Sequence, residues 1–235
     1  MIEALTPTEG LGVLHLFCKA APDVDTDKVL VAQRVLGAAG HELEPNAHKL
    51  VTAVLLGHKA DLCFLAYGPD LVRLRAFQTD IEASGLMVVD SYLSLTEVSE
   101  YAKGMPPERT RPRLYPELPP EGKRAFCFYP MSKRRGEADN WFALPYEERE
   151  RLMYAHGATG RGFAGRVLQL ITGSTGIDDY EWGVTLFAVH PDDLKDCVYT
   201  MRYDEASARF AEFGQFYTGM VASLSDALVA VGIRS

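Results

Sequence analysis

Tyr129-Pro-Met-Ser-Lys133 is a short segment whose residue types could do chemistry. It places a phenol, a thioether and an ammonium within one run, and Arg134 and Arg135 follow directly. A phenol donates a hydrogen bond, and lysine and arginine bind carboxylates through charge-assisted hydrogen bonds. The segment predicts either a redox or hydrogen-bonding tyrosine beside a carboxylate-binding cluster, or a buried rim residue beside a solvated basic stretch.

His156 lies in a second such segment, near the end of a predicted helix that begins at Pro145. Leu152 and Met153 precede it by one helical turn, so they share its face, which we expect to be buried. A neutral imidazole on an apolar helix face suits an axial ligand of haem iron. The alternative is a structural histidine stabilised by the negative end of the helix dipole.

The remaining histidines and all four cysteines favour structural roles. No two histidines have the i, i+4 spacing of a helical metal site, and no C-x-x-C motif is present. We expect the other five histidines to be structural or solvated and the cysteines to be buried free thiols. They are His15, His41, His48, His58 and His190, and Cys18, Cys63, Cys127 and Cys197.

The charge distribution limits the class of partner. The net charge of −8 disfavours a nucleic-acid partner, because phosphate binding needs an exposed basic surface. Cations nevertheless gather between residues 109 and 135, which suggests a small anionic ligand there. No apolar run is long enough to span a membrane, and the acidic N-terminal stretch does not resemble a signal peptide, so we expect a cytoplasmic protein.

The order of predicted elements indicates an α+β fold built from two similar halves. The first half, 1–103, has expected strands at 12–19, 50–56, 60–67 and 86–98, and helices at 23–37 and 69–85. A connector, 104–122, holds six prolines. The second half, 123–235, has expected strands at 125–131, 163–172 and 181–189, and helices at 145–160, 190–199 and 204–213. In both halves an apolar strand leads through Pro-Asp into a helix, which suggests two ferredoxin-like halves.

Several motifs in a fixed order resemble the coproheme decarboxylases, the haem-biosynthesis branch of the chlorite dismutase family. The similarity is densest over 125–220 and looser over 60–102. The motifs are Tyr129-Pro-Met-Ser-Lys133, Asp139-Asn-Trp141, Leu152-Met-x-x-His156-Gly-x-x-Gly160-Arg161, Trp182-Gly-Val-Thr-Leu-Phe-Ala188, Met201-Arg-Tyr-Asp-Glu-Ala-Ser207 and Phe216-Tyr-Thr-Gly219.

This resemblance implies a fold, an assembly and a reaction. The fold is a dimeric α+β barrel of two ferredoxin-like halves, with the haem pocket in the C-terminal half and the subunits in a homopentameric ring. The reaction uses hydrogen peroxide to decarboxylate two propionates of Fe-coproporphyrin III (coproheme) to vinyl groups, giving haem b.

The resemblance also implies a role for individual residues. His156 matches the iron ligand, and Tyr129 the residue that hydrogen-bonds a reactive propionate and relays an oxidising equivalent. Met131 matches a distal contact and Lys133 a propionate partner. The implied propionate anchors are Arg113, Arg202 and Ser207.

Gln169 distinguishes the two branches of the family. Chlorite dismutases carry arginine at the matching position, and a neutral amide cannot supply that cation. No histidine lies in 100–130 to match the distal base of some decarboxylases; Tyr115 lies in that region. Two alternatives remain: a chlorite dismutase or haem peroxidase on the same scaffold, and a non-enzymatic haem-binding protein.

Overall fold

The structure is a computed structural model that describes residues 2–37, 47–102 and 104–233, so His41 lies outside the described residues. The first group of elements comprises β1 (Gly12–Lys19), α1 (Thr26–Gly37), β2 (Lys49–Leu55), β3 (Leu62–Gly68), α2 (Leu71–Ala83), β4 (Met87–Thr96), η1 (Glu100–Ala102) and α3 (Pro107–Leu114). The second comprises β5 (Ala125–Lys133), η2 (Trp141–Ala143), α4 (Tyr146–Arg161), β6 (Val167–Gly173), β7 (Trp182–Ala188), α5 (Pro191–Met201), α6 (Glu205–Phe210), β8 (Ala211–Phe213), β9 (Tyr217–Ala222) and α7 (Leu224–Ala230).

The predicted α+β class is confirmed, and most of the predicted elements are present with shifted ends. The helix predicted over 204–213 is wrong in its last turn, because residues 211–213 leave the helix to pair with the end of β5 as β8. The strand predicted from residue 163 begins at Val167, since the glycine-rich stretch before it forms turns. Three further elements were not predicted. They are α3, which lies within the proline-rich stretch, and β9 and α7.

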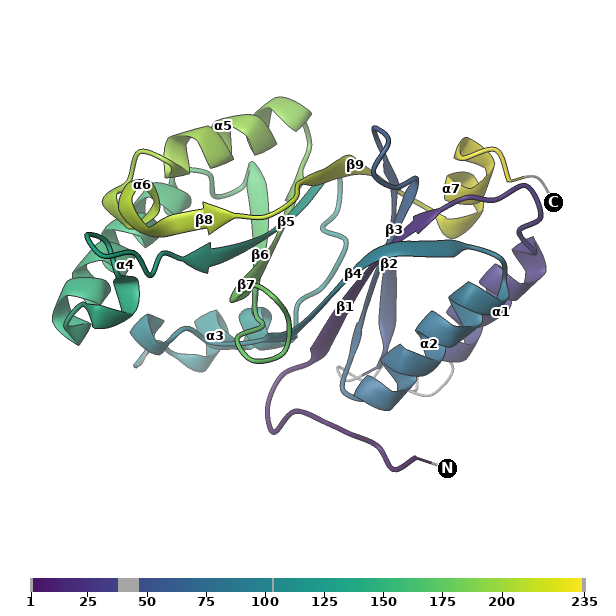
Figure 1. The fold of residues 1–235 in the computed structure, drawn as a ribbon, viewed down its shortest axis with the longest axis horizontal. Helices are drawn as coiled ribbons and strands as arrows, with labels where there is room; N and C mark the ends of the chain where they lie inside the picture. Colours follow the sequence, from purple (N-terminus) through teal and green to yellow (C-terminus); the bar gives the residue numbers. More distant parts are fainter. Residues whose placement is uncertain (1, 38–46, 103, 234–235) are drawn as a thin grey trace.

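The strands form one antiparallel sheet that closes on itself (Figure 1). Strands β4, β1, β3 and β2 lie side by side in that order, and β6, β7 and β5 form the second group. Strand β9 joins the groups by pairing with both β2 and β5, and β4 pairs with β6. The β5–β7 pairing completes the circuit, so few strand edges remain free.

β9 can approach β2 closely because residue 219 is glycine. A Cβ atom at Gly219 would collide with the Val54 carbonyl oxygen, so a larger residue would force the two strands apart. The junction between the two strand groups therefore depends on a backbone position without a side chain.

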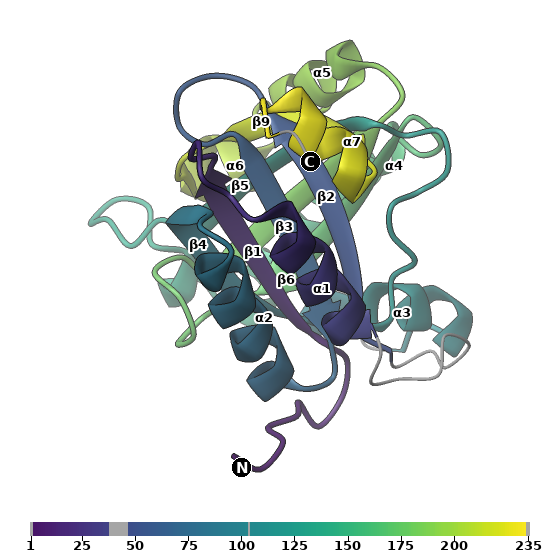
Figure 2. The same cartoon turned by 90° about the vertical axis from the view of Figure 1, so that its right-hand side faces the viewer.

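The alternation of side chains along each strand separates an inner from an outer face of the closed sheet. Aromatic rings fill the interior, among them those of Phe17, Phe126, Phe128 and Phe187. Helices α1, α2 and α7 cover the outer face of the first strand group (Figure 2). Helices α4, α5 and α6 lie on the side of the second group. No helix among residues 2–37, 47–102 and 104–233 is long and apolar enough to cross a membrane.

The four cysteines are buried and free, as predicted. His15 and His48 are also buried, whereas His58 and His190 are exposed. His15 lies in the interior of the closed sheet, where its Nε2 bonds the Thr185 hydroxyl at 2.9 Å and its Nδ1 has no partner. Its ring lies 4.2 Å from that of Phe128, centroid to centroid. Burial lowers the pKa of His15 to about 3, so the imidazole is neutral in the folded protein.

We predict that His15 makes the fold sensitive to acid. Below about pH 6.5 the unfolded chain binds a proton at this residue that the folded chain does not bind until about pH 3. The free energy of unfolding should therefore decrease as the pH is lowered through this window, by up to about 1.4 kcal/mol per pH unit from this group. In urea titrations from pH 7 to 4, His15→Gln should weaken this dependence, and the exposed His58→Gln should not. If the free energy of unfolding depended on pH equally in wild type and His15→Gln, His15 would not be the source of the acid sensitivity.

Candidate functional site

Strand β5 presents Tyr129, Met131 and Lys133 on its outer face, because they alternate with the inward-facing Phe126 and Phe128. The register with β7 and β6 aligns further side chains in rows across this face. One row runs Tyr129, Val184, Ile171; the next runs Met131, Trp182, Gly173; and a third runs Cys127, Leu186, Gln169. The sheet therefore places the predicted tyrosine, methionine, lysine and glutamine on one side.

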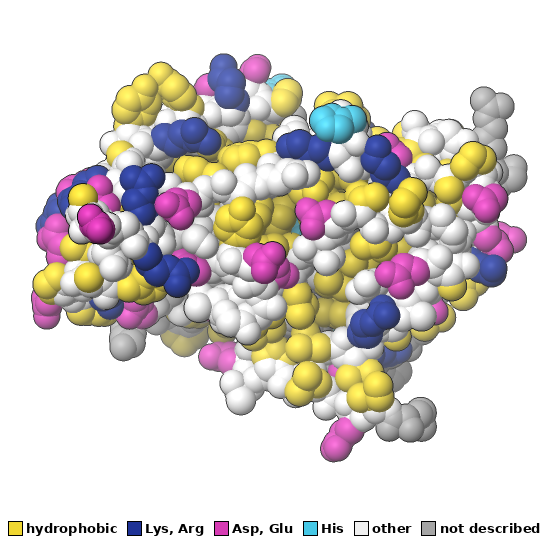
Figure 3. All heavy atoms as spheres, in the orientation of Figure 1, with side chains coloured by type: hydrophobic (Ala, Val, Ile, Leu, Met, Phe, Trp, Pro, Cys, Tyr) yellow, Lys and Arg dark blue, Asp and Glu magenta, His cyan; other side chains and the backbone are white. Residues whose placement is uncertain are grey.

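This outer face is covered unevenly. At the end near Ala125 and Ala188, side chains of α5 such as Leu194 and Cys197 pack against the strands. Toward the other end of these strands the face is more exposed to solvent: Ile171 is 42% exposed, and Met131 is partly exposed. Helix α4 packs chiefly on α5, α6 and η1. Figure 3 shows hydrophobic side chains between α5 and the β8–β9 region, with charged side chains on both sides. An apolar surface with a charged margin suits a flat apolar ligand that carries anionic groups.

His156 projects from α4 with its Nδ1 atom 3.0 Å from Oδ2 of Asp204. The Nδ1 proton can therefore be donated to the carboxylate, which leaves the Nε2 lone pair available to a metal. Within the described part of the chain, Nε2 has no hydrogen-bond partner. Burial alone would raise the pKa of Asp204, but hydrogen bonds from His156 and Ser207 and the nearby imidazole hold that pKa below its ordinary value.

Asp204 was not among the site residues predicted from the sequence. It is the N-cap of α6, where its side chain accepts a hydrogen bond from the backbone N–H of Ser207 at 3.1 Å. Capping preferences agree with the helix that the sequence predicted from residue 204. They could not show that the same carboxylate contacts a histidine 48 residues earlier in the chain.

Lys133 is buried beneath α6 and is 6% exposed. Its ammonium donates to the Ala206 carbonyl at 2.9 Å and lies 4.5 Å from the centre of the Trp141 ring. Burial lowers the pKa of Lys133 to about 8, although Asp204 and Glu181 act in the opposite direction. A lysine on β5 is thus electrostatically linked, through Asp204, to the histidine on α4.

Tyr129 is 8% exposed and packs among aromatic rings. Its ring stacks on Phe216 with centroids 4.4 Å apart and meets the Phe213 ring edge-on at 5.7 Å. Burial raises the pKa of the Tyr129 phenol well above its ordinary value, Cys127 and Cys197 add to this shift, and Arg202 opposes it. The phenol therefore stays protonated at neutral pH and can donate a hydrogen bond.

The remaining predicted residues differ in how closely they approach Tyr129, Lys133 and His156. The Arg202 guanidinium lies 4.8 Å from the centre of the Phe213 ring, at the margin of the face. The Ser207 hydroxyl donates to Asp204 at 3.1 Å and lies 3.5 Å from Nδ1 of His156. The Gln169 amide lies 3.7 Å from the Cys197 sulfur, near the C-terminal end of α4. Arg113 is exposed on α3, and in the described part of the chain its side chain makes no hydrogen bond or ion pair with these residues.

Glu97, just after β4, adds an acidic group that sequence reasoning missed. Its carboxylate accepts a hydrogen bond from Nε1 of Trp182 at 3.2 Å. The same carboxylate occupies the space that a Cβ atom at Gly173 would need. Since Trp182 and Gly173 are paired in the outer-face row of Met131, Glu97 lies over the same side of the sheet.

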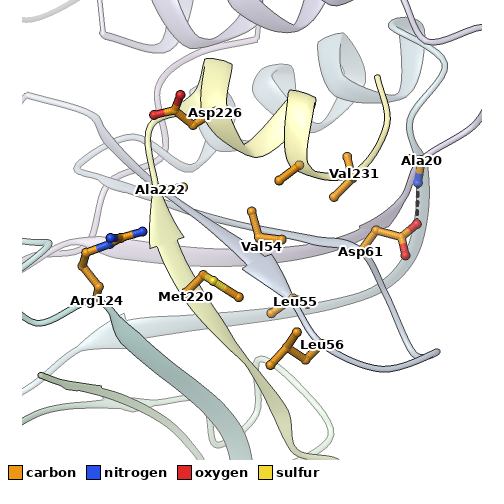
Figure 4. A pocket seen from close by; sticks show the side chains of 11 residues that line it. Ala20, Val54, Leu55, Leu56, Asp61, Arg124, Met220, Ala222, Asp226 and Val231 are labelled. Atoms are coloured by element: carbon orange, nitrogen blue, oxygen red, sulfur yellow. Dashed lines mark hydrogen bonds between the residues drawn. The ribbon is translucent and has the colours of Figure 1, made fainter. Parts of the chain in front are cut away.

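A separate hollow lies between β2, β9 and α7 (Figure 4). It measures about 620 Å³ and is lined mainly by aliphatic side chains, with Asp61, Arg124 and Asp226 among them. Asp61 is already engaged, since its carboxylate accepts a hydrogen bond from the Ala20 backbone at 2.9 Å. Arg124 is one of the cations between residues 109 and 135, but none of the individually predicted site residues lines this hollow.

The side chains present suit a metal ion whose remaining ligands come from the cofactor that contains it. Within residues 2–37, 47–102 and 104–233, no three His, Cys, Asp or Glu side chains come together to hold a bare metal ion. A single histidine with its second nitrogen fixed by a carboxylate is sufficient for porphyrin iron, because the macrocycle supplies the other nitrogens.

We predict that Asp204 fixes the tautomer of His156. Asp204→Ser keeps an N-cap residue but removes the carboxylate within reach of Nδ1, so the proton should redistribute toward Nε2. Long-range ¹H–¹⁵N spectra of histidine side chains at alkaline pH measure this distribution. Asp70→Ser, the same change at the N-cap of α2, should leave the His156 signals unchanged. An unaltered His156 tautomer in Asp204→Ser would contradict the role of the carboxylate.

Comparisons with known proteins agree on one family. The sequence model described as Chlorite dismutase matches residues 31–222. A coproheme decarboxylase from Staphylococcus saprophyticus is 46% identical over 177 residues, covering 71% of this chain and 70% of that protein. A heme-binding protein from Thermus thermophilus superposes with a TM-score of 0.82 at 36% identity, over 98% of this chain and 99% of the other. A mutant chlorite dismutase from Candidatus Nitrospira defluvii shares the fold, with a TM-score of 0.75 at 16% identity over 96% of this chain and 97% of the other.

Proposed function

Because the chain belongs to the chlorite dismutase family, we propose that it is a coproheme decarboxylase, which converts coproheme to haem b with hydrogen peroxide. The observation that carries this proposal is the arrangement of His156 and Asp204 beside the outer face that bears Tyr129 and Lys133. The first pair can hold iron, and the second pair can hold and oxidise a propionate.

The iron porphyrin, when bound, supplies the redox chemistry with peroxide, and the protein's residues bind and orient it. His156 offers Nε2 to the iron, and Asp204 keeps the proton on Nδ1. Met131 and Ile171 provide apolar contact for the macrocycle. Lys133, Arg202 and Ser207 provide donors for its carboxylates, and Arg113 is a further proposed anchor on α3.

Tyr129 is the residue proposed to act on the propionate. Its protonated phenol donates a hydrogen bond to the carboxylate and, after oxidation, removes a hydrogen atom from the β-carbon. Each propionate then releases carbon dioxide, a proton and two electrons as it becomes a vinyl group. One hydrogen peroxide accepts the two electrons, that proton and a second proton from the solvent, and becomes two water molecules, so each of the two decarboxylations uses one peroxide.

The neutral Gln169 favours this reaction over chlorite dismutation. Its amide lies on the outer face of β6, in the row of Cys127 and Leu186. An amide there can hydrogen-bond an oxygen species but cannot provide the positive charge of an arginine. The matched position therefore lacks the group that holds an oxychlorine anion.

The same family relationship supports further proposals about the whole protein. We propose that residues 1–103 and 123–235 are two ferredoxin-like halves joined by 104–122, and that the halves form a dimeric α+β barrel with the haem pocket in the second. The order β4-β1-β3-β2 and the β6-β7-β5 group with β9 beside it support this division. A homopentamer in the cytoplasm, with no nucleic-acid partner, completes the proposal.

The central experiment adds coproheme and hydrogen peroxide to the purified protein and follows the products by mass. We expect two successive losses of a carboxyl group in wild type. Tyr129→Phe should bind coproheme with little change but form haem b at least about a hundredfold more slowly, because the relay is lost. Tyr67→Phe, another buried tyrosine that faces the interior of the closed sheet, is the matched control and should retain activity. Full activity in Tyr129→Phe would remove that residue from the mechanism.

Lys133 should make coproheme binding depend on pH. Since its pKa is lowered to about 8, the ammonium is charged below that pH and loses its charge as the pH rises through it. We expect affinity for coproheme, measured by absorbance titration, to fall between pH 7 and pH 9. Lys133→Met should bind about tenfold more weakly at pH 7, and its decrease over this range should be smaller.

The control for this prediction is Lys28→Met, a change of an exposed lysine on α1. It should reproduce the wild-type affinity and the wild-type pH dependence. If Lys133→Met also reproduces both, Lys133 is not a partner of the ligand's carboxylates.

A further inference from the structure

Residues 214–216, between β8 and β9, form a short strap over Tyr129. At its start, the Gly214 N–H donates to the Pro130 carbonyl at 2.8 Å. A Cβ atom at Gly214 would lie 2.6 Å from a Pro130 carbon and 2.7 Å from the Tyr180 ring, so the strap passes tightly between them. At its end, Phe216 stacks on Tyr129 with an interplanar angle of 21°. The strap thus covers one side of the Tyr129 ring.

Lys59 holds the end of this strap from the other strand group. It lies in the turn between β2 and β3, and its ammonium donates to the Phe216 carbonyl at 2.6 Å. The same turn is fixed next to β9, because the Leu56 N–H donates to the Thr218 carbonyl at 2.8 Å. The contact therefore joins residues 157 positions apart in the sequence.

The chemistry of the contact favours a positioning role. An ammonium–carbonyl bond is charge-assisted and short, so it restrains the backbone of Phe216 more firmly than water would. Gly214 is fixed at one end and Phe216 at the other, so the phenyl ring has little freedom to leave the Tyr129 ring. Small displacements of a reacting group cost rate, because hydrogen transfer needs close approach and alignment.

We propose that Lys59 is a positioning residue for the reaction: it fixes Phe216 and thereby holds the Tyr129 ring in its reactive orientation. This inference rests on the proposed function of Tyr129. It assigns to the turn between β2 and β3, far from the iron ligand in sequence, a part in the chemistry on β5.

The test uses ¹⁹F NMR of the full chain labelled with 3-fluorotyrosine, in the absence of coproheme. The signal of residue 129 is identified as the one absent from Tyr129→Phe. In Lys59→Met this signal should shift or broaden, because Phe216 no longer stacks in one orientation. Lys59→Arg, which retains a cation able to reach the carbonyl, should restore the wild-type signal. Lys28→Met, a change of another exposed lysine, on α1, should match wild type.

The loaded enzyme gives a second measurement. Haem b formation by Lys59→Met should be about fivefold slower than in wild type, with unchanged affinity for coproheme. A residue 129 signal that is identical in Lys59→Met and wild type would overturn the proposal, as would an equal change in Lys28→Met. If the signal changes as expected but Tyr129→Phe still forms haem b normally, the proposed function of Tyr129 fails while the structural link from Lys59 stands.

Discussion

Strand β5 is the constraint on which the rest of the site depends, because it pairs with β7 on one side and with β8 and β9 on the other. These pairings fix its register, and a shift by one residue would turn Tyr129 and Lys133 into the interior. Phe126 and Phe128 oppose such a shift, since their rings are buried in the closed sheet. The aromatic interior therefore determines which residues can meet a ligand outside.

The imidazole and the carboxylate beside the outer face come from helices that follow β5 in the sequence. Helix α4 brings the imidazole of His156, and the N-terminus of α6 brings the carboxylate of Asp204 to the same point. Lys133 connects the sheet to this pair, because its ammonium lies against the first turn of α6. A change in the position of α6 would thus alter the imidazole and the lysine together.

The sequence carried much of this information in local patterns. The sequence predicted β5 as far as Met131, and the periodicity of α4 placed His156 with Leu152 on a partly buried face. The extension of β5 to Lys133, which puts Tyr129, Met131 and Lys133 on one face, became visible only in the structure. Strand ends were less predictable. Residues 211–213 have helix-compatible side chains but pair with β5, since the strand edge there offers backbone hydrogen bonds.

What the sequence alone determined is the type of most elements and the helix face on which His156 lies, because residue spacing reports local geometry. The family was indicated by the resemblance of several motifs in a fixed order. Only the tertiary structure decided that Asp204 meets His156, that Glu97 lies over Gly173, and that Lys59 reaches Phe216. Each of these contacts joins residues tens to more than a hundred positions apart. Packing of α4 on α6 brings the first pair together, pairing of β4 with β6 the second, and pairing of β2 with β9 the third, and no local pattern encodes these arrangements.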